Sequence, residues 1–321
     1  MNCSGNSSTA DVAFVGLYAL IFTLGLALNL AALGVFCCCS SVHSVTTVYM
    51  QNLAVSDLLM VFSLPVRVYY YSWRPCLAPQ FCELTGLLLL LNMYSSIFLL
   101  TCISGDRCLA VCFPLHARVQ AVRKQARCVC LGVWLLSCAG TVPTYFTQTK
   151  KNLTNCFDAQ PYYVTHPGVS SAMALGFGLP LLAMGLCSWA LLRAVHRSAA
   201  AHMALVNSAK IRRMILANLA IFLGCFLPFH LVLLCYQVPA LQGEALHLAY
   251  RCALLLASAN AALDPLAYYF ATETFQRVVL VDNLRRACGL HSASTEGHCR
   301  SLYLQEVTAL PDRSPSRGSH G

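Results

Sequence analysis

Apolar residues fill seven long stretches of the chain, and short polar segments separate each stretch from the next. The stretches cover residues 13–36, 48–71, 84–106, 128–146, 169–192, 214–236 and 246–271. A helix rises about 1.5 Å per residue, so about 20 apolar residues are enough to cross the hydrocarbon core of a bilayer. The pattern therefore predicts an all-α membrane protein with a bundle of seven transmembrane helices.

After the last stretch, apolar residues continue at helical spacing at Phe275, Val278 and Val279. This spacing predicts a short amphipathic helix that lies along the membrane surface. The following residues are rich in Ser, His and Gly, a composition typical of disorder. We therefore divide the chain into an extracellular N-terminal segment (1–12), a transmembrane domain that includes the amphipathic helix (13–280) and a disordered cytoplasmic tail (281–321).

The composition agrees with a membrane protein. Of the 321 residues, 58% are hydrophobic and only 10% are charged, whereas soluble domains carry about 25% charged residues. So few charges cannot solvate the surface of a globular protein of this size. The formal net charge of +9 does not indicate nucleic-acid binding, because the Lys and Arg residues gather in the short segments between the apolar stretches.

Basic residues are distributed unequally between the two sides of the predicted bundle. One side holds Arg118, Arg123, Lys124, Arg127, Arg193, Arg197, Lys210, Arg212, Arg213, Arg277, Arg285 and Arg286. The connections on the other side hold Arg74, Lys150 and Lys151. The positive-inside rule therefore predicts a multi-pass protein of the plasma membrane, with an extracellular N-terminus and a cytoplasmic C-terminus.

Three candidate modification signals agree with this orientation. Asn2, Asn6 and Asn152 each begin an N-glycosylation acceptor triplet, and all three fall on the predicted outer side. Cys288 follows a basic pair on the inner side and is a candidate palmitoylation site. Eight of the 19 cysteines lie inside the apolar stretches, where a thiol acts as a small apolar side chain.

Two carboxylates fall inside predicted membrane spans. Asp57 and Asp264 need a partner, water or a cation at that depth. The alternative is that they only hydrogen-bond neighbouring helices as packing contacts. Four of the spans contain a proline. Each proline can kink its helix, although kinks alone do not indicate a function. These prolines are Pro65, Pro180, Pro228 and Pro265.

Enzymes and transporters fit the sequence poorly. The ten histidines are scattered and form no metal cluster or nucleophile–base pair, and no CxxC pair is followed by a second one at zinc spacing. Transporters with intramembrane charges usually carry internal repeats, and the sequence shows none. We therefore expect neither an enzyme nor a resident metal cofactor.

Residues on successive stretches match the motifs of one receptor family, in the order of that family. They are Asn29, Asn52, Asp57, Cys82, Asp106, Arg107, Trp134, Pro180, Phe226, Pro228, Asp264, Pro265 and Tyr268. On these residues, the chain resembles the rhodopsin-like family of G-protein-coupled receptors over positions 13–280. The resemblance implies a heterotrimeric G protein as partner, with arrestin and receptor kinases as further partners.

The resemblance also implies roles for these residues. Asp106 would hold Arg107 in the inactive state and release it toward the G protein on activation. Cys82 would form a disulfide with Cys156 in the second outer loop, and whether Cys3 or Cys76 forms another stays open. Further switch positions would be Phe226, Pro228, Asp264, Pro265 and Tyr268. An allosteric sodium ion would be held by Asp57, Ser96, Asn260 and Asp264.

Three residues depart from the family pattern. Cys108 replaces the tyrosine that usually follows Arg107, Phe226 replaces a tryptophan, and Asp264 replaces an asparagine. The last two departures are typical of a branch that holds nucleotide, lysophospholipid and orphan receptors. Within that branch the chain most resembles receptors for lysophosphatidic acid, on segments that include residues 63–67, 92–94 and 259–265.

The candidate ligand site lies at the outer ends of the spans. Two arginines on different spans, Arg67 and Arg251, are expected to clamp one phosphate or carboxylate. Other candidate ligand residues are Tyr71, Tyr94 and His230. These residues predict an acidic lipid as ligand, a lysophospholipid such as lysophosphatidic acid. The alternatives are arginines that only reach the headgroups, a constitutively active orphan receptor, or a nucleotide receptor, which the apolar Leu233 disfavours because nucleotide receptors of the branch carry a cation there.

Overall fold

A computed structural model describes residues 9–38, 45–73, 77–113, 116–148, 157, 166–200 and 205–271. The glycosylation acceptors, Cys156, Cys288, the predicted amphipathic helix and the tail lie outside these residues. The statements made above about those parts of the chain stay predictions.

The described residues form helices and no strands. In chain order they are α1 (Thr9–Cys38), α2 (Val45–Val61), α3 (Leu64–Trp73), α4 (Pro79–Cys112), α5 (Ala117–Arg123), α6 (Ala126–Gln148), α8 (Pro167–Ala200), α9 (Leu205–Cys235), the short 3-10 helix η2 (Pro239–Leu241) and α10 (Glu244–Ala271). Seven segments are long and apolar enough to cross a membrane, and the second of them comprises α2 and α3 together. The predicted seven-helix bundle is therefore confirmed.

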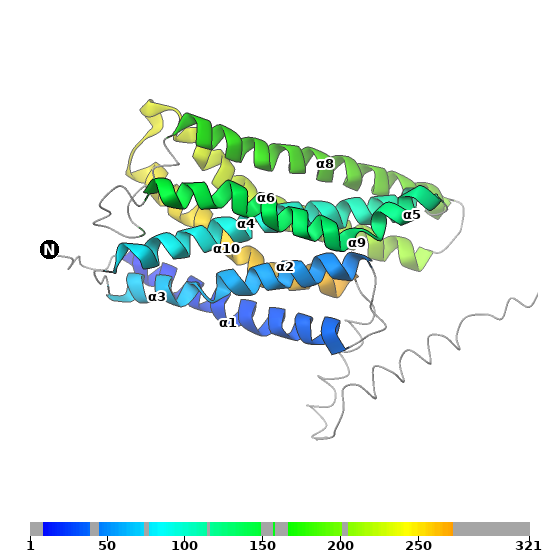
Figure 1. Ribbon diagram of the computed structural model, residues 1–321, viewed down its shortest axis with the longest axis horizontal. Coiled ribbons are helices and arrows are strands. Elements are labelled where there is room, and N and C mark those ends of the chain that lie inside the picture. Colours follow the sequence, from blue (N-terminus) through cyan, green and yellow to red (C-terminus); the bar gives the residue numbers. More distant parts are fainter. Residues whose placement is uncertain are drawn as a thin grey trace, which may run out of the picture.

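The helices lie side by side around α4 (Figure 1). This helix packs against α2, α6 and α8 and also contacts α9, while α1 packs against α2, α3 and α10. Figure 1 shows α3 and the start of α1 at one end of the bundle, on the left, and α5 at the other end. We call these the outer end and the inner end, after the orientation that the basic residues predict.

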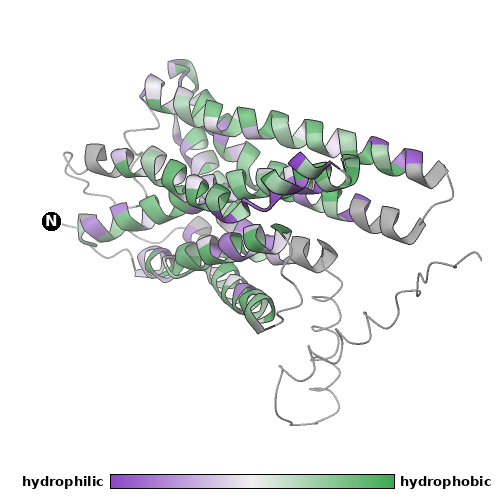
Figure 2. Cartoon of the chain, turned by 45° about the vertical axis from the view of Figure 1, so that its right-hand side comes forward, coloured by the Kyte–Doolittle hydropathy of each residue, from purple (hydrophilic) through white to green (hydrophobic). Residues whose placement is uncertain are grey.

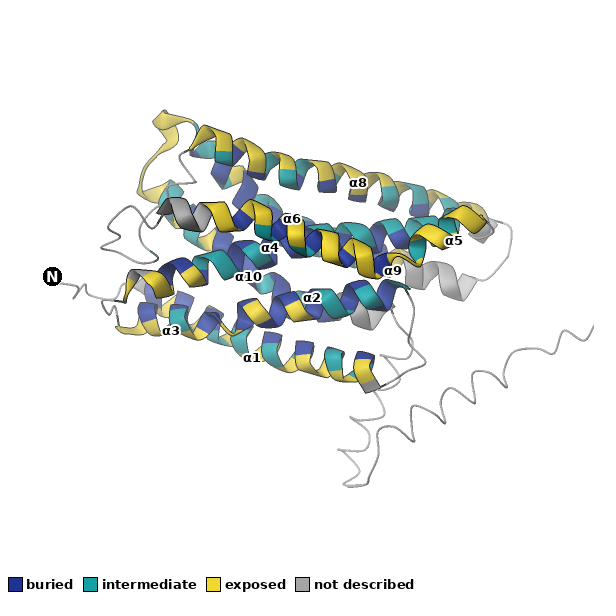
Figure 3. Cartoon of the chain, in the orientation of Figure 1, coloured by how far each residue is buried: buried dark blue, intermediate teal, exposed yellow. Residues whose placement is uncertain are grey.

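Large apolar side chains cover the outward-facing sides of the helices. Leu135 of α6 is 63% exposed and Leu186 of α8 is 68% exposed. Figure 2 shows that hydrophobic residues dominate the helices, and Figure 3 shows exposed residues along the outer sides of α6 and α8. A soluble protein rarely leaves so much apolar surface in water. Lipid tails are as apolar as leucine, so a bilayer accommodates this surface without cost.

The second span is interrupted just before Pro65. Helix α2 ends at Val61 and α3 begins at Leu64, so Pro65 stands in the first turn of α3, where its missing N–H breaks no helical hydrogen bond. The hydroxyl of Ser63 donates to the carbonyl of Met60 at 2.7 Å within the interruption. This break sets the direction of α3, the helix that carries Arg67 and Tyr71.

A close contact fastens α1 to its neighbours in the middle of the bundle. The side-chain amide of Asn29 donates to the carbonyl oxygens of Ala261 on α10 and of Gly25, at 2.7 and 2.9 Å. A Cβ at Gly25 would lie only 2.8 Å from Cγ2 of Val61 on α2, and Val61 is fully buried. The absence of a side chain at Gly25 therefore allows α1 to approach α2 this closely.

Replacing Gly25 by alanine is expected to destabilise the bundle by about 1–3 kcal/mol, because the added methyl forces apart two packed helices. The measurement is the midpoint of thermal unfolding of the purified protein in detergent. Gly34→Ala is the matched control, since it lies on the same helix at an exposed position and its Cβ would meet nothing within 4 Å. Equal losses in the two variants would contradict this packing argument.

Candidate functional site

Arg67 is a buried cation near the outer end of the bundle. Its side chain lies on α3, and the residue is only 2% exposed. The guanidinium carbon lies 4.4 Å from the ring centre of Phe157 and 5.8 Å from that of Tyr18. Within the described part of the chain no carboxylate pairs with it, and its Nε is buried without an acceptor. A buried charge in this state is costly, so Arg67 is poised to receive an anion.

Arg251 already has an anion. This arginine lies on α10, and its Nη2 is 2.7 Å from Oδ1 of Asp11, a fully buried carboxylate in the first turn of α1. Its guanidinium carbon lies 4.5 Å from the ring centre of Phe14 and 4.8 Å from that of Tyr71. The two predicted ligand arginines therefore differ in their partners, because Asp11 pairs with Arg251 whereas no carboxylate among the described residues pairs with Arg67. That both bind one ligand stays a prediction.

An aromatic platform joins the two arginines. We use this name for Phe14, Tyr18, Tyr71 and Phe157. The rings of Tyr18 and Tyr71 stack at 6.1 Å with an interplanar angle of 2°, and Phe14 stacks on Tyr71 at 5.5 Å. Tyr71, predicted as a ligand residue, is 2% exposed and belongs to this stack. Its role in the structure is to present a ring face to Arg251.

Arg251 also lines a groove at the outer end. The groove has a volume of about 490 Å³ and is formed by the first turns of α10, at Gly243, Glu244, His247, Leu248 and Arg251. Asp11 is not among these residues. Arg251 therefore lines the groove at the surface and, separately, pairs with Asp11 of α1.

Tyr94 and His230, the other predicted ligand residues, come together in a junction of three helices. The hydroxyl of Tyr94 on α4 lies 3.3 Å from Nε2 of His230 on α9 and 3.4 Å from the carbonyl oxygen of Met173 on α8. Nδ1 of His230 lies 2.8 Å from the carbonyl oxygen of Phe226, which can only accept, so this nitrogen carries the hydrogen. The junction connects α4, α8 and α9.

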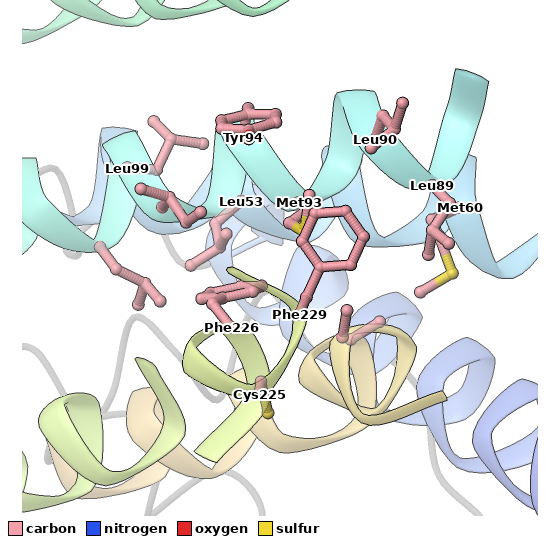
Figure 4. Close-up of a cluster of buried hydrophobic side chains, with 14 of the residues drawn as sticks. Leu53, Met60, Leu89, Leu90, Met93, Tyr94, Leu99, Cys225, Phe226 and Phe229 are labelled. Atoms are coloured by element: carbon pink, nitrogen blue, oxygen red, sulfur yellow. The ribbon is translucent and has the colours of Figure 1, made fainter. Parts of the chain in front are cut away.

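The predicted switch residue Phe226 lies one helical turn before His230. Figure 4 shows Phe226 and Phe229 of α9 pointing toward α4, where Met93 lies. Phe226 and Phe229 are fully buried, and the ring of Phe226 meets Phe222 edge to face at 5.7 Å. A movement of His230 would therefore displace side chains of the close-packed aromatic cluster between α9 and α4.

The predicted sodium residues form two hydrogen-bonded pairs in the middle of the bundle. Asp57 accepts a hydrogen bond from Asn92 at 2.9 Å, and Asn92 also lies 3.4 Å from the hydroxyl of Ser96. Asp264 accepts one from Asn260 at 2.9 Å. Four buried oxygens find no donor among the described residues, one each on Asp57, Asp264, Asn92 and Asn260. An all-oxygen set with two carboxylates fits a hard cation.

The inner end holds an ion pair that differs from the expected one. Oδ1 of Asp106 lies 2.6 Å from Nε of Arg123 on α5, and Oδ2 accepts from the hydroxyl of Thr46 at 2.6 Å. These partners take both carboxylate oxygens, and no ion pair joins Asp106 to Arg107 within the described residues. The hydrogen bond to Asp106 raises the pKa of Arg123, so Arg123 keeps its charge at physiological pH.

Asp106 consequently does not hold Arg107 in this structure. Its Nε is buried and finds no acceptor in the part of the chain that the structure describes. Cys108, in place of the usual tyrosine, points its thiol toward that of Cys112, 3.9 Å away. Asp106 therefore pairs with Arg123 in the structure, and not with Arg107 as predicted.

Cys82 at the outer end of α4 is disulfide-bonded. Its predicted partner, Cys156, lies outside the described residues, as does the side chain of Tyr268. Phe157, which follows Cys156 in the chain, packs edge to face against Tyr70 at 5.2 Å and under Arg67.

Comparison with known proteins decides the family. Residues 28–268 match the family described as 7 transmembrane receptor (rhodopsin family). The chain belongs to this rhodopsin family of receptors. The receptor is 32% identical to lysophosphatidic acid receptor 6 of Homo sapiens over 299 residues, which cover 88% of this chain and 87% of the relative.

The receptor is also similar to two further relatives. It is 36% identical to lysophosphatidic acid receptor 5 of Bos taurus over 319 residues, covering 91% of this chain and 86% of the relative. It is also 36% identical to a purinoceptor of Rattus norvegicus over 277 residues, covering 81% of this chain and 76% of the relative. The relatives are receptors, and the receptor described here is likewise not an enzyme.

The sequence did not indicate three residues that contact charged groups in the structure. Asp11 was counted with the polar N-terminal segment, although a lone carboxylate at the start of a span and a lone arginine at membrane depth are natural partners. Arg123 was counted only as a loop cation. Asn92 was seen as a polar residue in the third span but was not placed beside Asp57. Charge complementarity could have indicated the first of these, whereas no periodic signal indicates the other two.

Proposed function

We propose that this receptor binds an extracellular acidic lipid, a lysophospholipid such as lysophosphatidic acid, and responds by activating heterotrimeric G proteins. The observation that carries the proposal is Arg67, a 2% exposed cation with no carboxylate partner among the described residues. An anionic headgroup supplies the missing charge through a charge-assisted hydrogen bond. The aromatic platform beside it supplies apolar contact for the part of the lipid that follows the headgroup.

The relatives support a lipid more than a nucleotide. Two of those described above are named as receptors for lysophosphatidic acid and one as a purinoceptor. A nucleotide triphosphate needs several cations, but Leu233 of α9 stands where nucleotide receptors of this branch carry one, and it is fully buried. A single arginine that still needs a counter-ion suits a ligand with one small acidic group.

The proposal places the outer end outside the cell, in the plasma membrane. The unequal distribution of basic residues supports this orientation, because the side with more Lys and Arg faces the cytoplasm. Arg107 would then lie on the cytoplasmic side, where it contacts the G protein on activation. Arrestin and receptor kinases would act at the same end.

We also propose that the buried oxygens near Asp57 and Asp264 hold an allosteric sodium ion. When bound, the ion supplies positive charge between two buried carboxylates, because unpaired negative charge is costly at membrane depth. Asp57, Asp264, Asn92 and Asn260 would hold it with the oxygens that find no donor among the described residues, and the hydroxyl of Ser96 lies beside them.

Replacing sodium chloride by choline chloride is expected to raise agonist affinity of the wild-type receptor several-fold, because the ion stabilises the inactive bundle. Asp57→Asn is expected to abolish this salt effect. Competition binding in membranes at constant ionic strength measures it. Ser72→Ala, a change at an exposed hydroxyl of the same span, serves as the control. A salt effect that survives in Asp57→Asn would exclude this site.

The test of the proposed function is a panel of ligands on cells that express the receptor. The panel pairs lysophosphatidic acid with the uncharged monoacylglycerol of the same tail and includes nucleoside di- and triphosphates. G-protein dissociation is measured for each G-protein class, with Arg107→Ala as the inactive control. We expect responses to the acidic lipid only. A nucleotide response, or equal responses to the charged and uncharged lipids, would contradict the proposal.

A further inference from the structure

The buried carboxylate of Asp11 sits at the candidate ligand site although it has the same charge as the proposed ligand. We propose that Asp11 is a built-in anion that occupies Arg251 and thereby favours a headgroup with one negative charge over a headgroup with two. This inference rests on the proposed function, because it concerns the headgroup of the same acidic lipid. It makes Asp11 a specificity-determining residue.

The contacts of the pair show how firmly Asp11 is held. Its Oδ1 lies 2.7 Å from Nη2 of Arg251, the carboxylate is fully buried, and the side chain of Arg251 is only 11% exposed. The ring centres of Phe14 and Tyr71 lie within 5 Å of the guanidinium carbon of Arg251 and cover part of it. A ligand that displaces Asp11 would leave this carboxylate buried without its counter-ion, which is strongly unfavourable.

Counting charges over the aromatic platform gives the selectivity. Arg67 and Arg251 contribute two positive charges, and the stacked rings of Tyr18 and Tyr71 connect them at 6.1 Å. Asp11 cancels one of these charges. Among the described residues in contact with the platform, one positive charge is left, on Arg67, and a headgroup with a single negative charge neutralises it. A second negative charge would face Asp11, and such like-charge contacts select against a ligand.

Two related lipid headgroups differ in this charge. A phosphomonoester carries about −1.5 to −2 charges at pH 7, whereas a cyclic phosphodiester carries one. Lysophosphatidic acid and cyclic phosphatidic acid have these two headgroups and can carry the same acyl tail. Asp11 should therefore weaken the response to the phosphomonoester relative to the cyclic phosphodiester.

The experiment compares the potencies of these two lipids on the full-length receptor in cells, with surface expression measured for each variant. In Asp11→Asn, the potency of lysophosphatidic acid relative to cyclic phosphatidic acid should rise about tenfold or more over the wild-type ratio. Asp11→Glu keeps the charge and should keep the wild-type ratio. The double variant Asp11→Asn/Arg251→Gln should return the ratio toward wild type, because the gain acts through Arg251.

The remaining outcomes are distinguishable. An unchanged ratio in Asp11→Asn would overturn this inference and leave the proposed function intact. A changed ratio that persists in the double variant would also overturn it, since Asp11 would then act without Arg251. Silence of both lipids on the wild-type receptor would refute the proposed function, and the inference with it.

Discussion

Arg67→Ala is expected to lower the potency of an acidic lipid by about 30-fold to more than 1000-fold, because truncating one partner of a buried charge pair costs about 2–5 kcal/mol or more. The physical reason is that Arg67 is the buried arginine of the site that lacks a carboxylate among the described residues. Concentration–response curves for G-protein dissociation measure the change. The maximal response should be reached at higher lipid concentration.

Two comparisons separate loss of charge from loss of folding. Arg67→Lys keeps the positive charge but loses the planar fork and its stacking on Phe157, so we expect an intermediate loss. Surface expression of each variant shows whether the receptor reaches the membrane. If Arg67→Ala responded to every acidic lipid with wild-type potency, Arg67 would not bind the headgroup.

Arg123→Ala is expected to lower the basal, ligand-independent signal. In the structure, Arg123 and Thr46 occupy the carboxylate of Asp106, so Arg107 is not held by its neighbour. Removing Arg123 frees Asp106 to hold Arg107 in the inactive arrangement that the family resemblance implies. A bias of about 1 kcal/mol changes a two-state ratio about fivefold, so basal nucleotide exchange should fall several-fold toward the Arg107→Ala level.

The matched control for this prediction is Lys124→Ala. Lys124 adjoins Arg123 at the end of α5 and is exposed, so its removal changes the charge of the loop equally without touching Asp106. Basal exchange is measured in membranes without added lipid. A higher basal signal in Arg123→Ala would mean that the pair of Asp106 and Arg123 itself restrains the receptor.

The seven-helix fold could be predicted because each membrane span is recognisable from the residues of that span alone. Length and apolarity decide whether a segment crosses the bilayer, since every backbone polar group must be satisfied within the helix. The third span was predicted at 84–106, whereas the observed helix covers Pro79–Cys112, because the helix continues beyond the hydrocarbon core on both sides. The break at Pro65 was expected only as a kink, since a proline does not reveal whether it stands inside a helix or at its start.

Parts of the site were also within reach of sequence reasoning. Asp57, Ser96, Asn260 and Asp264 were predicted to lie together, and Asp57 and Ser96 both meet Asn92 in the structure. The burial of Arg67 at the outer end agrees with a polar residue that faces the bundle interior.

Charge complementarity marks Asp11 as a candidate partner for an arginine, but no local pattern could assign which charges pair. Asp11 and Arg251 are 240 residues apart, and Asp106 and Arg123 belong to different helices. Whether an arginine pairs with a ligand or with another residue depends on which side chains the three-dimensional packing brings within about 4 Å, and no local pattern encodes that distance. For this reason Arg67 and Arg251 looked equivalent in the sequence but differ in the structure.

The most direct test of the central claim is binding of a labelled lipid to the purified receptor in lipid nanodiscs. Lysophosphatidic acid and the uncharged monoacylglycerol of the same tail compete for the labelled site on the wild-type receptor and on Arg67→Gln. The account predicts saturable binding, strong preference of the wild type for the acidic lipid, and loss of that preference in Arg67→Gln. Equal competition by the two lipids on the wild type would contradict the claim that Arg67 recognises an acidic headgroup.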